Sequence, residues 1–314
     1  MAATAATTPK IRVVLSIDFD AVSGWLGTGA HPANNLADYS SGFFAARVGV
    51  PRLLRLLAKH GIASRVTWFV PGHSAESFPE AMASIIASGA EVACHGYAHE
   101  DAARLTAAQE RDVMEKCVEV LQAAGAPRPV GWRAPLYSVR EGTLDLLEEL
   151  GFEYDASLTD HDSQAFFAPR RPPIEPIDFD QPAASWMRPL AAEEAGSVKA
   201  YPADRRPLVE VPCNWYMEDM TPMQFLPHTP NSHGYVDARH IEQMWKDRFM
   251  WLWENEVEDG KECLFPILLH PDTSGMAHVI GMIERMITWL QSWGPDIEFS
   301  QTREVARIFR ERSL

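Results

Sequence analysis

Short apolar runs alternate with amphipathic stretches along most of the chain. Residues 11–17 are largely apolar and β-branched, which predicts a buried strand. Pro51 then opens a helix with leucines on one face, and Gly61 ends it. This strand–helix alternation recurs seven or eight times without a clear reversal, which predicts a parallel α/β fold and favours a (β/α) barrel. Further strands are predicted over 62–70, 90–94, 130–132, 208–211, 264–269 and 297–299, and further helices over 236–258, 279–290 and 302–312.

Three predicted helix starts show capping-box spacing, in which a Ser or Thr precedes a Glu or Gln by three residues. The boxes begin at Ser77, Thr106 and Ser138. We expect the side chain of each to accept a hydrogen bond from the first turn of its helix. The predicted helix ends are Gly89, about Ala124 and Gly151.

Two segments interrupt the alternation. Residues 23–50 are rich in Gly, Asn, Ser and Ala and predict a long loop, in which Trp25 either lies at the rim of a site or anchors a surface loop. Residues 155–207 are rich in proline and predict an irregular insertion. We expect this insertion to pack on the domain, because its aromatic side chains need burial. Those side chains are Phe166, Phe167, Phe179 and Trp186.

Composition narrows the class of protein. The 314 residues suffice for one large domain, predicted over 11–314 after a flexible segment 1–10. A net charge of −15 argues against a nucleic-acid partner. The four scattered cysteines predict buried reduced thiols rather than disulfides. No signal peptide and no apolar run of about 18–20 residues is evident, which predicts a cytoplasmic protein with no membrane partner.

Polar residues with chemical potential follow several predicted strands. Asp18 and Asp20 close the first strand and point the same way, because side chains alternate along a strand. His95 and His99 have a spacing that one helical turn can present to a metal ion. Each residue alone also has an ordinary structural explanation, such as a turn or a surface charge. Arg133 and His270 follow two further strands.

Together these residues suggest metal-assisted hydrolysis of an acyl–nitrogen bond. One carboxylate and two imidazoles make a three-ligand site with room for water and substrate. The second carboxylate can act as a general base, and Arg133 would keep it ionised. His270 could protonate the leaving nitrogen.

The ordered set resembles the polysaccharide deacetylase family, whose catalytic unit is the NodB homology domain. Ser16 to Asp20 is similar to the first motif of that family, 95–99 to the second, 133–137 to the third and 269–270 to the fifth. The resemblance implies a single distorted (β/α) barrel of about seven parallel strands and a divalent metal, usually zinc, with cobalt or nickel as alternatives. It implies these roles: Asp18 as base, Asp20, His95 and His99 as metal ligands, Arg133 orienting the base, His270 as acid, and Trp25, Tyr137, Trp215 and Asp219 as substrate-binding residues.

The chain departs from familiar members of this family, because Phe19 separates its two aspartates and a long segment follows them. These features resemble the intracellular branch, which includes peptidoglycan-deacetylase-like proteins, cyclic imide hydrolases and allantoinases, and whose members tend to form tetramers. We therefore expect a homo-oligomer that removes acetyl groups from an N-acetylated sugar or peptidoglycan-type substrate. A ring-opening hydrolase of cyclic imides or ureides is the alternative. A catalytically inactive carbohydrate-binding protein is the second.

Overall fold

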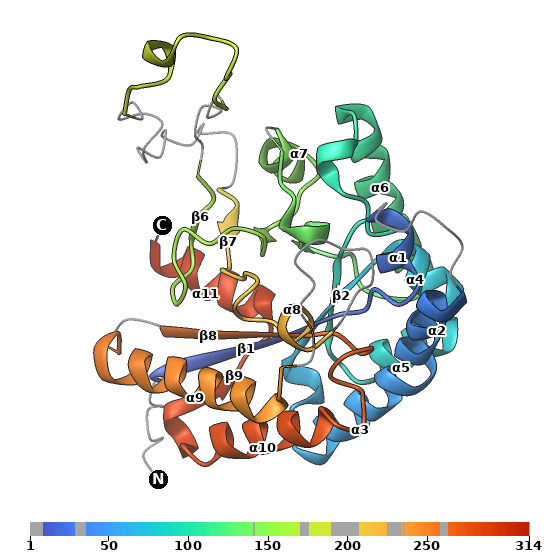
Figure 1. The fold of residues 1–314 in the computed structure, drawn as a ribbon. Helices are drawn as coiled ribbons and strands as arrows, with labels where there is room; N and C mark the ends of the chain where they lie inside the picture. The colour runs from blue at the N-terminus through green and yellow to red at the C-terminus, as the bar shows by residue number, and fades with distance from the viewer. Residues whose placement is uncertain are drawn as a thin grey trace.

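The computed structural model describes residues 9–28, 36–140, 142–169, 176–189, 207–224, 234, 236–257 and 263–313. Within these residues the strands form one nine-stranded sheet in the order β6-β7-β5-β4-β3-β2-β1-β8, and β9 pairs with β1 (Figure 1). Neighbouring strands are parallel except β6 and β7. The strands are β1 Ile11–Asp18, β2 Thr67–Val70, β3 Glu91–Cys94, β4 Gly131–Trp132, β5 Tyr154–Asp155, β6 Phe166–Phe167, β7 Val209–Glu210, β8 Cys263–Leu269 and β9 Ile297–Phe299.

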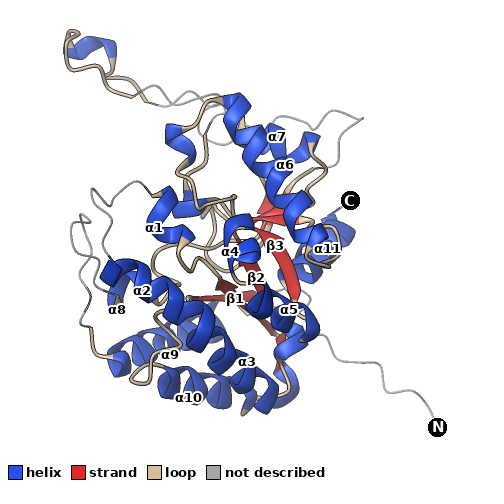
Figure 2. Cartoon of the chain, turned by 90° about the vertical axis from the view of Figure 1, so that its right-hand side faces the viewer, coloured by secondary structure: helices blue, strands red, loops and turns tan. Residues whose placement is uncertain are grey.

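Helices surround the sheet, whose strands lie in the interior of the molecule (Figure 2). The α-helices are α1 Ser23–Gly27, α2 Leu36–Phe44, α3 Val50–Lys59, α4 Gly72–Ser77, α5 Pro79–Ala87, α6 Ala107–Ala123, α7 Thr143–Glu149, α8 Met220–Met223, α9 Ala238–Asn255, α10 Ile280–Gln291 and α11 Thr302–Ser313. Their apolar faces bury Leu53 and Leu57 of α3 and Phe249 of α9. Burying each such side chain contributes about 1.5–3 kcal/mol of stability.

β1 is the central strand of the barrel. All eight of its residues are buried, and it pairs with β2, β8 and β9. Segments between the named strands bring the two ends of the sheet together. Glu218 forms a parallel bridge with Leu268, and the Leu264 N–H donates a 2.7 Å hydrogen bond to the Ser163 carbonyl. The predicted distorted barrel is therefore confirmed, with one antiparallel strand that the sequence did not indicate.

The predicted loop over 23–50 is wrong in its described part, which is mostly helical. α1 follows β1 closely, and α2 continues through a π-helical segment, Ala45–Gly49, into α3. Small residues in α2 and in the π-helical segment allow other parts of the chain to approach these helices closely. A Cβ on Gly42 would lie 2.6 Å from the Val22 backbone nitrogen. Glycine here reflects close packing rather than an irregular chain.

Helix starts were predicted with mixed success. Thr106 forms the predicted capping box with Gln109. Ser77 instead ends α4, and the N-cap of α5, Phe78, makes no side-chain capping hydrogen bond. Ser138 donates a 2.7 Å hydrogen bond to Asp101, and α7 begins only at Thr143. Its hydroxyl is therefore used between loops rather than at a helix. β2 likewise starts at Thr67, later than predicted.

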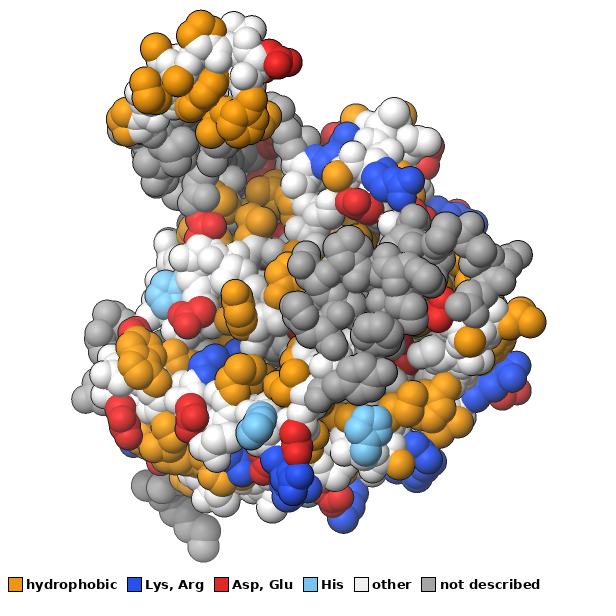
Figure 3. Space-filling model, viewed as in Figure 1, with side chains coloured by type: hydrophobic (Ala, Val, Ile, Leu, Met, Phe, Trp, Pro, Cys, Tyr) orange, Lys and Arg blue, Asp and Glu red, His pale blue; other side chains and the backbone are white. Residues whose placement is uncertain are grey.

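The proline-rich insertion does not bury its aromatic residues as expected. Phe179 is 82% exposed and packs against Trp186, with 5.9 Å between ring centroids. Figure 3 shows the hydrophobic side chains of the described segment 176–189 gathered on a protrusion at the upper left. Phe166 and Phe167 are half-buried in β6. Phe167 does pack on the domain, 5.0 Å from Phe309 of α11 between ring centroids, whereas Phe179 and Trp186 contact each other away from the core.

Two other expectations concern the chain as a whole. The four cysteines are free and buried, as predicted. Among the described helices, none has both the length and the apolar character that a membrane span requires. The predicted flexible N-terminus lies almost entirely outside the described residues.

Candidate active site

Asp20, His95 and His99 come together where β1 and β3 end. One donor atom of each lies within 4.8 Å of the others. His95 Nε2 is 3.4 Å from Asp20 Oδ1, and His99 Nε2 is 3.5 Å from Asp20 Oδ2. All three side chains are buried. The arrangement is a three-ligand cluster of the kind that binds a divalent metal.

The protonation states of this cluster fit a metal. His95 Nδ1 lies 2.8 Å from the Arg133 carbonyl, which only accepts, so Nδ1 carries the proton and Nε2 offers a lone pair. Burial lowers the pKa of His95 and lowers that of His99 to about 4, so both rings are neutral at pH 7. Within the described residues, Asp20 Oδ1 is buried without a hydrogen-bond partner. A cation would satisfy that oxygen.

The two histidines reach the cluster from a loop rather than from the helical turn that their spacing suggested. Gly96 and His99 both adopt left-handed backbone conformations, with φ of 72° and 61°. The Glu100 carboxylate accepts hydrogen bonds from the backbone N–H groups of Tyr97 and Ala98, at 3.0 and 2.8 Å. These contacts fix the loop that turns both rings toward Asp20.

Asp18 lies beside the cluster and is paired with Arg133. Arg133 Nη1 donates a 2.6 Å hydrogen bond to Asp18 Oδ1. The guanidinium also donates to Ser16 Oγ and to the Ala156 carbonyl, both at 3.2 Å. Burial alone would raise the pKa of Asp18, but the charge and hydrogen bond of Arg133 together with the neighbouring histidines outweigh burial, and the pKa is lowered. Asp18 is therefore an ionised carboxylate beside the candidate metal ligands.

His270 approaches the cluster from the end of β8. Its Nε2 is 3.9 Å from Asp20 Oδ2, and its Nδ1 donates a 2.7 Å hydrogen bond to Asp219 Oδ1. The other Asp219 oxygen accepts hydrogen bonds from the His270 backbone N–H and from Ser274 Oγ. Burial opposes the charged imidazolium, but Asp219 together with the nearby carboxyl groups of Glu218 and Asp20 outweighs burial and raises the pKa of His270 well above its ordinary value.

These groups line one pocket of about 180 Å³. The predicted substrate-binding residues Trp25, Tyr137 and Trp215 also line it, and their aromatic side chains form part of its apolar wall. Asp219 does not: it is fully buried behind His270, which it orients. The structure thus brings every other predicted site residue to one pocket.

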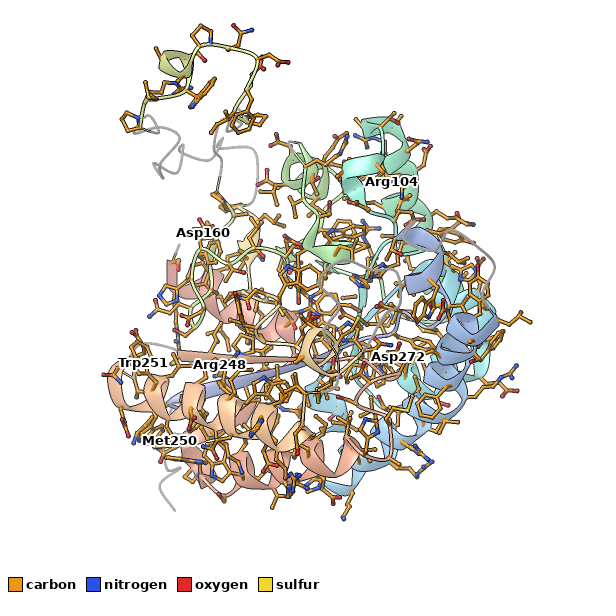
Figure 4. All side chains as sticks on the ribbon, in the orientation of Figure 1. Arg104, Asp160, Arg248, Met250, Trp251 and Asp272 are labelled. Atoms are coloured by element: carbon orange, nitrogen blue, oxygen red, sulfur yellow. The ribbon has the colours of Figure 1, made fainter. Side chains whose placement is uncertain are left out.

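Sequence reasoning missed several residues of this pocket. Glu218 and Asp272 add two carboxyl groups to its lining, and Gln224 donates a 2.8 Å hydrogen bond to Asp272. Asp272 lies in the loop after β8 (Figure 4). A signal was present, since Glu218 precedes Asp219 and Asp272 follows His270 by two residues. Acidic residues so close in sequence to predicted site residues are themselves candidates for the site.

Comparisons with known proteins agree with the geometry of the site. A family model described as "Polysaccharide deacetylase" matches residues 39–154. The Gibberella zeae "Peptidoglycan deacetylase-like protein FGM2" is 51% identical over 303 residues, covering 96% of this chain and 86% of that protein. The Helicobacter pylori "Peptidoglycan deacetylase" is 38% identical over 305 residues, covering 97% and 98%. The chain belongs to the polysaccharide deacetylase family.

Solved structures agree with this membership. A crystal structure from Mycobacterium smegmatis that bears the polysaccharide deacetylase name has a TM-score of 0.79 and 25% identity, covering 99% of this chain and 94% of that one. PuuE allantoinase shares the fold, with a TM-score of 0.73 and 20% identity over 96% of this chain and 91% of that one. The resemblance drawn from the motifs is confirmed, and membership of the polysaccharide deacetylase family implies a hydrolase that acts on amide bonds.

Proposed function

We propose that this polysaccharide deacetylase is a metal-dependent hydrolase that removes the acetyl group from an N-acetylated sugar of the peptidoglycan type. The observation that carries the proposal is the convergence of three kinds of group on one pocket. They are a cluster of metal-ligand type, an ionised carboxylate at Asp18 and a charged imidazole at His270. The names of the two relatives support the choice of substrate.

Asp20, His95 and His99 would hold the divalent ion, for which we propose zinc, with cobalt or nickel as alternatives. When bound, such an ion supplies a Lewis acid that polarises the acyl oxygen and lowers the pKa of water. The neutral imidazoles and the unpartnered Asp20 oxygen are the donor set that this ion requires.

The residues around the ligands divide the proton transfers between two sides of the pocket. Asp18, kept ionised by Arg133, accepts the proton of the attacking water. His270, kept protonated by Asp219, donates a proton to the leaving nitrogen as the carbon–nitrogen bond breaks. The products are acetate and an amine. Trp25, Tyr137 and Trp215 would contact the sugar.

A ring-opening hydrolase of cyclic imides or ureides is the second candidate. The same groups would cleave a carbon–nitrogen bond in a small ring. The favouring observation is the lining residue Trp25 of α1, which is only 8% exposed and narrows the pocket on that side. Assembly as a homotetramer and a cytoplasmic location stay predictions that rest on resemblance to the intracellular branch.

The test compares the wild type with two variants and a matched control. Metal content is measured together with hydrolysis of N-acetylglucosamine oligomers, succinimide and hydantoin. We expect the double variant His95→Ala/His99→Ala to lose both metal and activity, because two of three ligands are gone. Asp18→Asn should keep metal and lose activity. His60→Ala, a histidine that pairs with Glu284 away from the pocket, should keep both.

Each outcome separates the candidates. Release of acetate from the oligomers supports the proposed deacetylase, whereas opening of the rings alone supports the second candidate. Full activity in metal-free protein would contradict metal dependence. Sugar binding without hydrolysis of any compound would favour the inactive carbohydrate-binding protein.

A further inference from the structure

Glu218 is a buried acid in the pocket wall to which the proposed chemistry gives no role. It is 2% exposed and lines the pocket beside Leu268 and His270. Burial raises its pKa to about 7. Placing a carboxyl group in such surroundings has a free-energy cost, so its position calls for a compensating interaction.

The pairing of strands places Glu218 on the same wall as His270. Glu218 forms a parallel bridge with Leu268, and the Leu268 N–H donates a 2.9 Å hydrogen bond to the Met217 carbonyl. His270 follows Leu268 by two residues, and side chains two apart share one face of a strand. Leu268, His270 and Glu218 all line the pocket. Glu218 therefore lies near the group that protonates the leaving nitrogen.

The two oxygens of Glu218 differ in their surroundings. Oε1 accepts hydrogen bonds from the Thr221 backbone N–H, at 3.2 Å, and from the Thr221 hydroxyl. Within the described residues, Oε2 has no hydrogen-bond partner, and the surrounding atoms do not cover it completely. Since the residue lines the pocket, this oxygen is accessible from it. Thr221 thus fixes the carboxyl group while one oxygen stays available.

A purely structural role does not explain this arrangement. Glu218 does receive the Thr221 N–H at the start of α8, but a hydroxyl or amide acceptor would satisfy that N–H without a buried charge. Asp272, the other additional acid of the pocket, likewise has one oxygen held by a donor, the Gln224 amide. Glu218 differs from Asp272 in its bridge to Leu268, which places it on the pocket wall that carries His270.

We propose that Glu218 binds the nitrogen side of the substrate: its carboxyl group accepts the N–H of the scissile amide and then pairs with the ammonium group of the product. This inference rests on the proposed function, because it takes His270 as the donor to the leaving nitrogen. When the carbon–nitrogen bond breaks, the proton from His270 first gives a neutral amine, and the acetyl group leaves with the hydroxyl of the water as acetic acid. The amine takes up the proton that the acetic acid releases, which gives the ammonium group and acetate, and the proton that Asp18 took from the water restores His270. Glu218 is thereby a determinant of specificity for nitrogen over oxygen at this position of the substrate.

The experiment measures binding rather than turnover. Calorimetry compares the dimer of glucosamine with the dimer of glucose, which carries hydroxyl groups in place of amines. Wild type should bind the amino sugar more tightly. Glu218→Gln keeps an acceptor for Thr221 but presents N–H groups to the pocket, so we expect at least about a tenfold loss for the amino sugar and little change for the glucose dimer.

Two control variants separate specific from general effects. Thr221→Val removes the hydroxyl bonded to Glu218 but keeps the carboxyl group, and it should retain the preference for the amine. Asp272→Asn removes the other additional carboxyl group from the same pocket and should have a smaller effect. An equal loss in either control would overturn the inference, because local structure or total charge would then explain it.

The wild type itself gives the remaining outcomes. Equal affinity for the two dimers, including no measurable binding of either, would overturn the inference. Turnover of the N-acetylglucosamine dimer is measured on the same preparation with added zinc. A protein that prefers the amino sugar but releases no acetate would overturn the proposed deacetylase while supporting the role of Glu218 in binding.

Discussion

A buried pair of acids beneath Arg133 should make the stability of the protein depend on pH. Asp155 and Glu210 end the neighbouring strands β5 and β7, and both are fully buried. Glu210 Oε1 accepts 2.8 Å hydrogen bonds from the backbone N–H groups of Ser157 and Leu158. Asp155 Oδ1 accepts a 2.7 Å hydrogen bond from Ser157 Oγ. The pair thus holds the turn that follows β5.

The sign of the pH effect follows from the direction of the pKa shifts. Burial raises the pKa of Asp155 from 3.8 to about 6, and burial with the neighbouring Asp155 raises that of Glu210 further. When the pKa of a carboxyl group is higher in the folded than in the unfolded state, the protein loses stability as the pH rises from the unfolded-state pKa to the folded-state pKa. For Asp155 the window is about pH 4 to 6. A shift of about two units corresponds to ~3 kcal/mol.

Glu210→Gln should remove most of this loss of folding stability at high pH. A glutamine keeps an acceptor for the two backbone N–H groups and offers an N–H to Asp155, as the protonated acid does. Burial and the neighbouring Asp155 raise the pKa of Glu210, and the substitution removes the cost of ionising this second acid. Relative to wild type, we expect a gain of about 1–3 kcal/mol at pH 8, or roughly 2–4 °C in Tm per kcal/mol, and little change at pH 4.5.

Thermal and urea unfolding at pH 4.5, 6 and 8 would measure this difference. Glu119→Gln, on the exposed surface of α6, makes the same chemical change without burial and should give a pH-independent difference near zero. If Glu210→Gln were equally or less stable than wild type at pH 8, the argument would be refuted. The pair would then be held ionised by Arg133 rather than sharing a proton.

Two further changes test how the site is held. Gly27→Ala would place a Cβ 2.0 Å from the Ala98 carbonyl oxygen in the loop that carries the two proposed metal-binding histidines, so we expect it to lower both zinc affinity in a competition titration and Tm. Gly281→Ala in α10, whose Cβ would make an ordinary 3.7 Å contact with the end of the Arg285 side chain, should instead raise Tm slightly, and equal effects would contradict the packing argument. Asp219→Asn removes a charged carboxylate that accepts two hydrogen bonds from His270. Losing this charge-assisted interaction, worth about 1.5–3 kcal/mol, should lower kcat about 10–100-fold and leave KM and metal content unchanged. An unchanged kcat would show that His270 needs no such partner.

The sequence predicted that the candidate metal and catalytic residues would meet in one pocket, because their positions follow from topology. Parallel strands end at one edge of a sheet, so Asp20, His95, Arg133 and His270 could be placed together without knowledge of the turns between them. The family resemblance then separated base from ligand. None of this required side-chain geometry, since the order of polar strand ends along the chain contained the information.

The covering helices and the acids behind the site could not be predicted in the same way. Gly27 and Gly42 indicated a loop by composition, but each lies where another segment approaches closely. That reason depends on tertiary contacts absent from a local pattern. Asp155 and Glu210 each follow an apolar residue in a two-residue strand, which is too short to give a periodic signal.

The charges of the buried site provide an argument for the proposed cation that does not depend on the relatives. Three buried carboxyl groups contact the arginine and histidines of the site: Asp18, Asp20 and Asp219. Arg133 neutralises Asp18 at 2.6 Å, and protonated His270 neutralises Asp219 at 2.7 Å. Among the ionisable groups of the described residues, Asp20 is paired with neutral imidazoles within 3.5 Å and with the more distant His270, and burial raises its pKa. The proposed divalent ion would supply the missing positive charge, so its binding should become weaker at low pH as Asp20 and the two histidines take up protons.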